Sequence, residues 1–396
     1  MKSILIAGAS IAGPALAWWL HREGFKPTLV EKAPAPRPGG HAIDIRGAAL
    51  DVVRAMGLEN EIRSHRTRMK GVSKLDGEGR EVWRSEAMTI SGGSFDKQAV
   101  EIIREDLSRI IVSALPRDIE TIYGDCVGAL REGDDRVVVT FQSGRERAFD
   151  LVVGADGLAS GMRKRVFGPD DEFVVPFNVA LAPFSAPNIL GLEDWQLSYE
   201  SGRDRCMIYT APGNRDLRVC FGFPVGMADI PGDRAGQIAL VRRECSDMAW
   251  EVPRLLDAME QAPDFYLGPV AQVKMDRWTR GRIALVGDAG YCPSPYTGQG
   301  TSLAVVGAYV LARELAQSPE EHTGAFARYE ARMRPFVKVN QAIADLSRDP
   351  RFMEDPSYYI EVIEPAMAKA ERAIELEGLP LGPQAHTRES SAPAAS

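Results

Sequence analysis

Residues 3–31, SILIAGASIAGPALAWWLHREGFKPTLVE, decide the fold class of this chain. An apolar run at 3–7 leads into Gly8, a helical stretch follows, and a second apolar run ends at Glu31. A strand, a tight glycine turn, a helix and a second strand form the βαβ unit that binds dinucleotides in doubly wound α/β proteins. The sequence therefore predicts an α/β chain with a dinucleotide site at its start.

The turn itself reads Gly8-Ala9-Ser10-Ile11-Ala12-Gly13, so Ser10 replaces the middle glycine of G-x-G-x-x-G. Gly8 can adopt backbone angles that a side chain forbids. Gly13 allows the helix and strand to pack closely, and the free N–H groups of the helix start point at a pyrophosphate. Glu31 follows where a carboxylate can accept hydrogen bonds from ribose hydroxyls. Ser10 is small enough to let a phosphate approach, but this unit alone leaves NAD and FAD equally open.

The composition excludes several function classes. The 396 residues suffice for two domains, and the net charge of −8 argues against nucleic acid as a partner. No apolar stretch is long enough to predict a transmembrane helix, and the N-terminus lacks the pattern of a signal peptide. The five cysteines form no C-x-x-C pair, which favours reduced thiols and a cytoplasmic protein. The histidines show no metal-ligand spacing and no G-x-S-x-G elbow occurs, so no metal site or catalytic triad is expected.

The remaining chain predicts a nucleotide-binding domain interrupted by a β-rich insertion. Residues 47–57 and 97–115 show helical periodicity, whereas 172–280 alternates short β-rich runs with proline and glycine turns. This alternation of β-rich runs and turns favours an antiparallel sheet inserted into the nucleotide-binding domain. The expected domains are a nucleotide-binding domain (1–70, 97–171 and 281–345), a substrate-binding sheet domain (71–96 and 172–280), a C-terminal helix (346–378) and a disordered tail (379–396).

Two further segments favour a flavin. One is the strand-like run 151–163, LVVGADGLASGMR, and the other is 282–300, RIALVGDAGYCPSPYTGQG, in which a buried strand delivers Asp288. The ribityl chain of FAD needs an acceptor such as Asp288. The N–H groups of a helix that begins at 298–301 can stabilise the negative charge of the reduced flavin ring. Gly298 and Gly300 would keep side chains off the ring, and Pro295 could form a rigid wall facing it.

These three motifs, in this order, resemble the class A (single-component) flavoprotein aromatic monooxygenases, the group that includes para-hydroxybenzoate hydroxylase. The match spans roughly residues 3–345, and the compact length is similar to the tetracycline-inactivating and polyketide-tailoring monooxygenases. The resemblance implies a Rossmann-like FAD-binding domain of the glutathione-reductase type with an inserted antiparallel β-sheet domain and C-terminal helices. Two departures stand out: Ser10 in the glycine turn, and Gly290-Tyr291 where the family usually has alanine-histidine.

The resemblance also implies an activity and a set of cofactor residues. The activity is insertion of one oxygen atom from O₂ into an aromatic or polycyclic phenolic molecule through a flavin C4a-hydroperoxide, with NADPH or NADH as a transient reductant. No catalytic side chain is predicted, because the flavin carries the chemistry. The expected cofactor-binding residues are Gly8, Ser10, Ile11, Ala12, Gly13, Glu31, Lys32, Arg37, Arg104, Val127, Asp156, Asp288, Pro295, Gly298, Gly300 and Thr301.

Among these residues the resemblance assigns separate roles. Glu31 would bind the adenosine ribose, and the backbone of Val127 would meet adenine. Arg37 would lie near the flavin, and Arg104 beside the pyrophosphate and ribityl chain. Asp156 would serve both FAD and the pyridine nucleotide. No second glycine fingerprint occurs, so the reductant would bind transiently along a surface groove.

The substrate is less defined than the cofactor. Aromatic and soft residues suit a flat apolar substrate, and the predicted pocket residues are Phe184, Tyr199, Met207, Tyr209, Phe221, Phe223 and Pro295. Four arginines, Arg203, Arg205, Arg215 and Arg218, are candidates for binding a carboxylate or enolate, with none preferred. The alternative functions are a flavin-dependent reductase similar to geranylgeranyl reductases and an FAD-retaining regulatory protein. The choice between hydroxylation, Baeyer-Villiger oxidation and epoxidation stays open, as does a monomer or a dimer.

Overall fold

A six-stranded sheet built on the first βαβ unit forms the centre of the computed structural model, which describes residues 1–36, 38–86, 99–349, 351 and 356–376. Its order is β17 (Thr279–Arg280), β18 (Ile283–Leu285), β11 (Leu151–Gly154), β1 (Ser3–Ala7), β2 (Lys26–Glu31) and β7 (Glu120–Tyr123). Every neighbouring pair is parallel except β17 and β18. The central strands are almost wholly buried, as expected for a parallel sheet covered on both faces.

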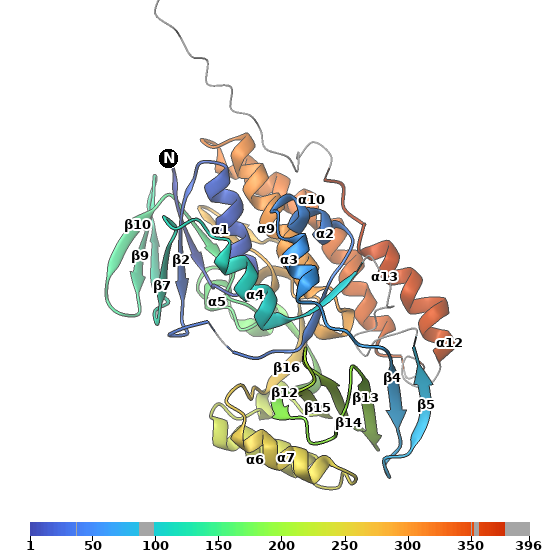
Figure 1. Cartoon of the computed structure of the whole chain (residues 1–396). Coiled ribbons are helices and arrows are strands. Elements are labelled where there is room, and N and C mark those ends of the chain that lie inside the picture. Colours follow the sequence, from blue (N-terminus) through green and yellow to red (C-terminus); the bar gives the residue numbers. More distant parts are fainter. Residues whose placement is uncertain (37, 87–98, 350, 352–355, 377–396) are drawn as a thin grey trace, which may run out of the picture.

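The helices of this domain pack in a layer beside the sheet (Figure 1). Helix α1 packs against α9, and α9 packs against α10. The helices are α1 (Ala12–Arg22), α2 (Ala48–Ala55), α3 (Glu59–Ser64), α4 (Arg104–Ser113), α5 (Gly161–Val166), α8 (Asp288–Tyr291), α9 (Gly300–Gln317) and α10 (His322–Leu346), with the short turns η1 (Asp170–Glu172) and η3 (Pro295–Thr297). A small antiparallel sheet of β8 (Val127–Glu132), β9 (Val137–Phe141) and β10 (Glu146–Phe149) lies at the side.

The helix expected over 97–115 is partly a strand. Strand β6 (Val100–Ile103) pairs antiparallel with β3 (Ala42–Ile45), and α4 begins only at Arg104. The β-branched residues of β6 pack into the core, and this tertiary pairing overrides the helical periodicity of the sequence. The strand places the start of α4 beside the loop at 39–41.

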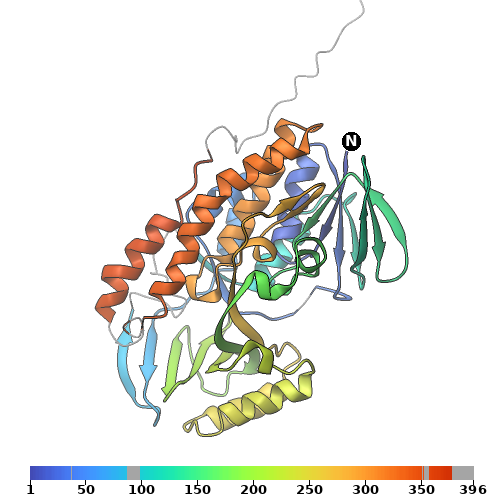
Figure 2. The ribbon, with the colours of Figure 1, turned by 180° about the vertical axis from the view of Figure 1, so that it is seen from behind.

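A seven-stranded sheet forms the second layer (Figure 2). Its order is β16 (Gly268–Val273), β12 (Val174–Pro187), β15 (Asp216–Pro224), β14 (Asp204–Thr210), β13 (Gln196–Ser201), β4 (Val72–Leu75) and β5 (Glu81–Ser85). All pairs are antiparallel except β13 with β4, because β4 enters the sheet from a distant part of the chain. Helices α6 (Arg234–Glu244) and α7 (Val252–Gln261), with the turn η2 (Met227–Asp229), cover the outer face.

The last described segment docks on the first domain. It consists of α12 (Pro356–Tyr358), η4 (Tyr359–Ile363) and α13 (Glu364–Ala370). Asn340 Nδ2 of α10 donates a 3.1 Å hydrogen bond to the carbonyl oxygen of Ala370. The N–H of Ala48 in α2 donates a 3.0 Å hydrogen bond to the carbonyl oxygen of Glu371. The tail predicted at 379–396 lies outside the described residues. Within the described part, no helix is long and apolar enough to cross a membrane.

Candidate functional site

The glycine turn after β1 is set by close backbone approaches. Gly8 has a φ of +113°, and a Cβ there would lie 2.3 Å from the carbonyl oxygen of Ala155. A Cβ at Gly13 would lie 1.9 Å from the oxygen of Gly8. Only glycine fits either position. The turn therefore packs directly against the Asp156-Gly157 segment (the Asp-Gly segment), which follows β11. The residue between them, Ser10, accepts a 2.9 Å hydrogen bond on its carbonyl oxygen from Ser108 of α4.

Glu31 ends β2 beside this turn. Its carboxylate accepts hydrogen bonds from the N–H groups of Ala9 and Ala33, each at 2.9 Å. The N–H of Asp125 donates to the carbonyl oxygen of Glu31 at 3.2 Å, which brings the start of β8 close to the end of β2. The structure thus gathers Glu31 and the buried Val127, the two residues expected at the adenosine end, near the turn.

The helices that begin near this turn have no side-chain caps. Helix α1 follows Ile11 and α9 follows Gln299, and neither residue caps its helix. The helices α5, α6 and α10 are capped by Ser160, Asp233 and Glu321, whereas α2, α3, α4 and α7 lack a side-chain cap as α1 and α9 do. The first N–H groups of α1 and α9 therefore remain available for an anionic ligand.

The Gly-Asp segment lies between these two helix starts. A Cβ at Gly287 would lie 3.1 Å from the Cβ of Ala12 and 3.5 Å from that of Ala304. Asp288 follows, and its Oδ1 would be 3.7 Å from a Cβ at Gly300. Burial raises the pKa of the Asp288 carboxyl, while a hydrogen bond with Cys292 and the charge of Arg104 lower it. The structure therefore brings together residues of α1, α4, α8 and α9 that the sequence separates.

Asp156 is held within the segment that leads into α5. The Asp156 carboxylate accepts hydrogen bonds from Ser160 Oγ at 2.5 Å and from the N–H of Met162 at 3.0 Å, so it stabilises the start of α5. Burial raises the pKa of Asp156. Lys32 is exposed just after β2, and Arg37 lies outside the described residues.

The start of α9 carries buried polar atoms that the described residues leave without hydrogen-bond partners. Gln299 and Ser302 are fully buried, and neither the Gln299 amide atoms nor the Ser302 hydroxyl has a hydrogen-bond partner among the described residues. Such atoms are costly unless a bound group satisfies them. Thr301 is buried in the same turn, whereas Pro295 is exposed in η3 and Gly298 adopts a left-handed conformation. The glycine turn at 8–13, the uncapped starts of α1 and α9, and the unsatisfied atoms of Gln299 and Ser302 together form a cradle whose chemistry fits FAD as the ligand.

Sequence reasoning missed two groups near this site. It named the glycines around Gln299 but not Gln299 itself, although the residue lies inside the quoted G-Q-G motif. It also missed Asp44 and Arg46, which form a buried ion pair at 3.0 Å at the end of β3. Alternating charges in the short run I-D-I-R were the available signal, because a strand places both side chains on one face.

The predicted substrate residues divide between the two faces of the seven-stranded sheet. Phe184, Tyr199, Phe221 and Phe223 lie in the core that the sheet forms with α6 and α7. Their alternation along the strands directs them away from the FAD-binding layer, so they do not line its side of the sheet. Met207 and Tyr209 point the other way. The Tyr209 hydroxyl lies 2.9 Å from His41 Nδ1 and accepts from the N–H of Ala42 at 2.5 Å.

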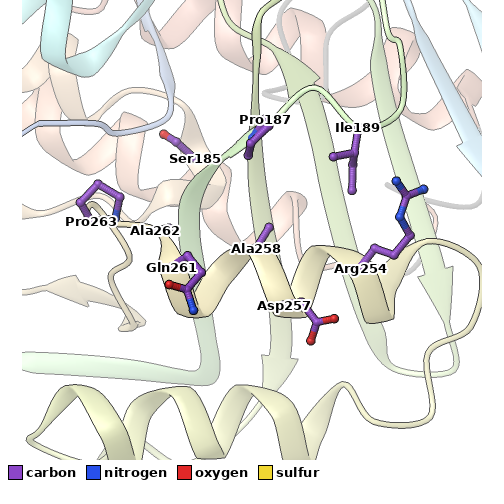
Figure 3. A pocket seen from close by; sticks show the side chains of 9 residues that line it. All are labelled: Ser185, Pro187, Ile189, Arg254, Asp257, Ala258, Gln261, Ala262 and Pro263. Carbon is purple, nitrogen blue, oxygen red and sulfur yellow. The ribbon is translucent and has the colours of Figure 1, made fainter.

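A cavity of about 560 Å³ lies elsewhere, where the end of β12 meets α7 (Figure 3). It is bounded by Ser185 and Pro187 of β12 and by Arg254, Asp257 and Gln261 of α7. None of the predicted cofactor or substrate residues lines it, and it is open to solvent. The described residues also contain no cluster of histidine, cysteine or carboxylate side chains that could hold a metal.

Comparison with known proteins assigns the class. The chain belongs to the FAD binding domain family, whose model matches residues 1–342. A flavin-dependent monooxygenase from an unknown prokaryotic organism is 40% identical over 385 residues, covering 95% of this chain and 98% of that protein. An uncharacterized protein of Mycobacterium tuberculosis is 42% identical over 342 residues, covering 86% and 92%. The crystal structure of tetracycline destructase Tet(51) superposes with a TM-score of 0.86 at 33% identity, covering 95% and 99%.

These findings confirm the predicted fold class, the flavin cofactor and the enzyme class. The protein is a flavin-dependent monooxygenase that binds FAD. The individual cofactor contacts remain predictions that the geometry above supports.

Proposed function

We propose that this monooxygenase uses NADPH or NADH and O₂ to insert one oxygen atom into an aromatic or polycyclic phenolic molecule. The observation that carries the proposal is the contact between the seven-stranded sheet and the FAD-binding domain. The face of the seven-stranded sheet that bears Met207 and Tyr209 meets the loop at His41 and Ala42. The carbonyl oxygen of His41 accepts a hydrogen bond from the backbone N–H of Arg104, at the start of α4. The candidate FAD cradle therefore borders a sheet face with apolar and aromatic residues.

Different residues of the cradle would bind different parts of FAD. The glycine turn and the start of α1 would bind the pyrophosphate, and Glu31 would bind the adenosine ribose. Asp288 would accept hydrogen bonds from the ribityl hydroxyls. The start of α9, with Gln299, would meet the polar edge of the flavin ring. Bound FAD supplies hydride acceptance and oxygen activation.

The face of the seven-stranded sheet that is turned toward this cradle would hold the substrate. Met207 lies directly opposite Cys220 in the strand register, and Cys220 is almost fully buried. Together with Tyr209 they offer an apolar surface that suits a planar ring system and excludes water. Solved relatives are tetracycline destructases, so antibiotic modification is part of this proposal. The described cysteines are all free, which favours the reducing cytoplasm as its location.

The decisive experiment combines cofactor analysis with isotope labelling. Purified protein should be yellow and release FAD on denaturation, and Asp288→Ala should retain less FAD. With NADPH or NADH, ¹⁸O₂ and a panel of polyphenols and tetracyclines, mass spectrometry should find a product that carries one ¹⁸O atom. Reduced products without oxygen gain would instead favour a flavin-dependent reductase and contradict the proposal.

A further inference from the structure

Ser294, in the loop between α8 and α9, has a backbone conformation that side chains rarely adopt. Its φ is +83° and its ψ is +147°, and the next residue is Pro295. A residue before proline normally has a negative φ, and this combination of angles is found almost only at glycine. Ser294 is also buried, so the surrounding structure holds it in place. Backbone strain of this kind clusters at active sites and ligand-binding loops.

Two glutamines hold the loop just before the strained serine. Gln272 of β16 is buried, and its Nε2 donates to the carbonyl oxygens of Pro293 at 3.0 Å and of Gln341 at 2.8 Å. Gln341 belongs to α10, and its Nε2 donates to the carbonyl oxygens of Val273 at 2.8 Å and of Cys292 at 3.2 Å. Each side-chain amide therefore binds both the loop and the backbone at the other glutamine. We call this pair the glutamine clamp.

The contacts that hold this loop come from both parts of the fold. Strand β16 is at the edge of the seven-stranded sheet, whereas α10 packs against α9 in the FAD-binding domain. A further contact lies on the other side of the serine, where the ring of Tyr296 stacks on that of Phe177 of β12 with the centroids 5.9 Å apart. The loop is therefore fixed both before and after Ser294.

Hydrogen bonds connect Ser294 to the start of α9. The carbonyl oxygen of Ser294 accepts the hydroxyl of Thr297 at 3.0 Å, and the oxygen of that hydroxyl accepts the N–H of Gln299 at 3.2 Å. Gln299 directly precedes α9, and its side-chain amide has no hydrogen-bond partner among the described residues. A displacement of the loop at Ser294 would therefore displace the donors at the start of α9.

We propose that Gln272 and Gln341 are positioning residues for the flavin, because they hold Ser294 in its strained conformation and so keep the start of α9 at the polar edge of the ring. Hydride from NADPH or NADH leaves one negative charge on the ring, and the N–H groups of a helix start stabilise such a charge. The clamp therefore favours binding of reduced over oxidised FAD. This inference rests on the proposed function, which places the edge of the flavin ring at α9.

The test measures the midpoint potential of bound FAD, which needs neither substrate nor turnover. Gln341→Met removes the amide donor and keeps a side chain of similar length. We expect its preference for reduced over oxidised FAD to fall about tenfold, which makes the midpoint potential about 30 mV more negative than in the wild type. The matched control is Gln237→Met in α6, which loses a similar hydrogen bond from Nε2 to the carbonyl oxygen of Pro231 at 2.9 Å and should keep the wild-type potential.

A second background separates positioning from a simple loss of packing. Ser294→Gly releases the strain, because glycine adopts a positive φ readily. In that background Gln341→Met should lower the potential less, since the loop no longer has to be held against its preferred conformation. An unchanged potential in Gln341→Met overturns the proposal, as does an equal fall in both backgrounds or in the Gln237→Met control.

FAD retention decides which variant is compared. If Gln341→Met retains no FAD, Gln272→Met, which lacks the hydrogen bond to Pro293, is measured in its place. Should both lose FAD, urea unfolding of the apoproteins decides: a midpoint like that of Gln237→Met supports positioning, and a clearly lower one overturns it. A wild type that incorporates no ¹⁸O refutes the proposed reaction and leaves the result for the clamp standing.

Discussion

Arg163 Nη1 donates a 2.9 Å hydrogen bond to the carbonyl oxygen of Ala289, the residue after Asp288. Arg163 is fully buried, and its Nη2 also donates to the carbonyl oxygen of Leu158 at 2.6 Å and to Asp170 at 2.7 Å. The guanidinium thus connects the Asp-Gly segment to the Gly-Asp segment. It fixes the start of α8, and with it the direction of the Asp288 carboxylate.

We expect Arg163→Met to lower the free energy of unfolding by about 2–4 kcal/mol, because two carbonyl groups and a carboxylate lose their donor. FAD affinity should fall as well, since α8 is no longer held. The matched control is Lys164→Met, which removes the half-exposed partner of Asp170 at 2.8 Å and should cost no more than about 1 kcal/mol. Urea unfolding and FAD titration of both variants check this. Equal effects of the two would contradict it.

Gly300→Ala separates cofactor binding from folding. A Cβ there meets nothing closer than 3.7 Å, and alanine favours a helix start over glycine, so stability should be unchanged or slightly higher. FAD occupancy should fall, because the added methyl group enters the space kept for the ring. Gly13→Ala is the comparison, since its Cβ would lie 1.9 Å from the oxygen of Gly8 and both stability and FAD should be lost. Full FAD occupancy in Gly300→Ala would count against the site.

The fold and the cofactor were predictable because their signals are local. The glycine turn, Glu31 and the Gly-Asp segment each indicate a strand end or a helix start within a few residues of the sequence. The partners of these motifs were not predictable in the same way. That Gly8 approaches Ala155 follows only from the pairing of β1 with β11.

The sequence could not show which face of the sheet each candidate substrate residue occupies, for a similar reason. Aromatic residues on a strand suit a pocket and a core equally, and only the positions of α6 and α7 show which face is covered. Phe184 and Phe221 stack at 5.7 Å inside that core. The sequence likewise does not show that Arg218 Nε is shielded from water without a hydrogen-bond partner among the described residues, because this depends on how the neighbouring strands pack.

Tyr291, which replaces the usual histidine, is accommodated by Gly307. A Cβ at position 307 would lie 1.9 Å from the Tyr291 hydroxyl, which is 3.0 Å from that of Tyr329. We expect Gly307→Ala to cost about 1–3 kcal/mol through overpacking. In a Tyr291→Phe background the same change should cost less, because the clashing oxygen is gone. A double-mutant cycle of unfolding free energies measures this coupling, and additive effects would contradict it.

His41 connects the two layers through a fully satisfied set of hydrogen bonds. Its Nε2 lies 3.2 Å from the carbonyl oxygen of Val219, which can only accept, so Nε2 carries the proton. Nδ1 is then the acceptor for the Tyr209 hydroxyl. This arrangement requires a neutral imidazole. Burial, followed by the charge of Arg218, lowers the pKa of His41 to about 4, while Val219 and Asp264 act in the opposite direction.

The consequence is a defined pH dependence of stability. In the unfolded chain the His41 pKa is about 6.5, so between pH 6.5 and 4 only the unfolded state takes up this proton. The contribution is fully present above pH 6.5, is lost as the pH falls toward 4, and amounts to at most about 3 kcal/mol. His41→Gln keeps a donor for Val219 and an acceptor for Tyr209 but cannot titrate. Urea unfolding from pH 7.5 to 4.5 should therefore show a steeper loss for the wild type than for His41→Gln, and parallel curves would show that His41 does not titrate as inferred.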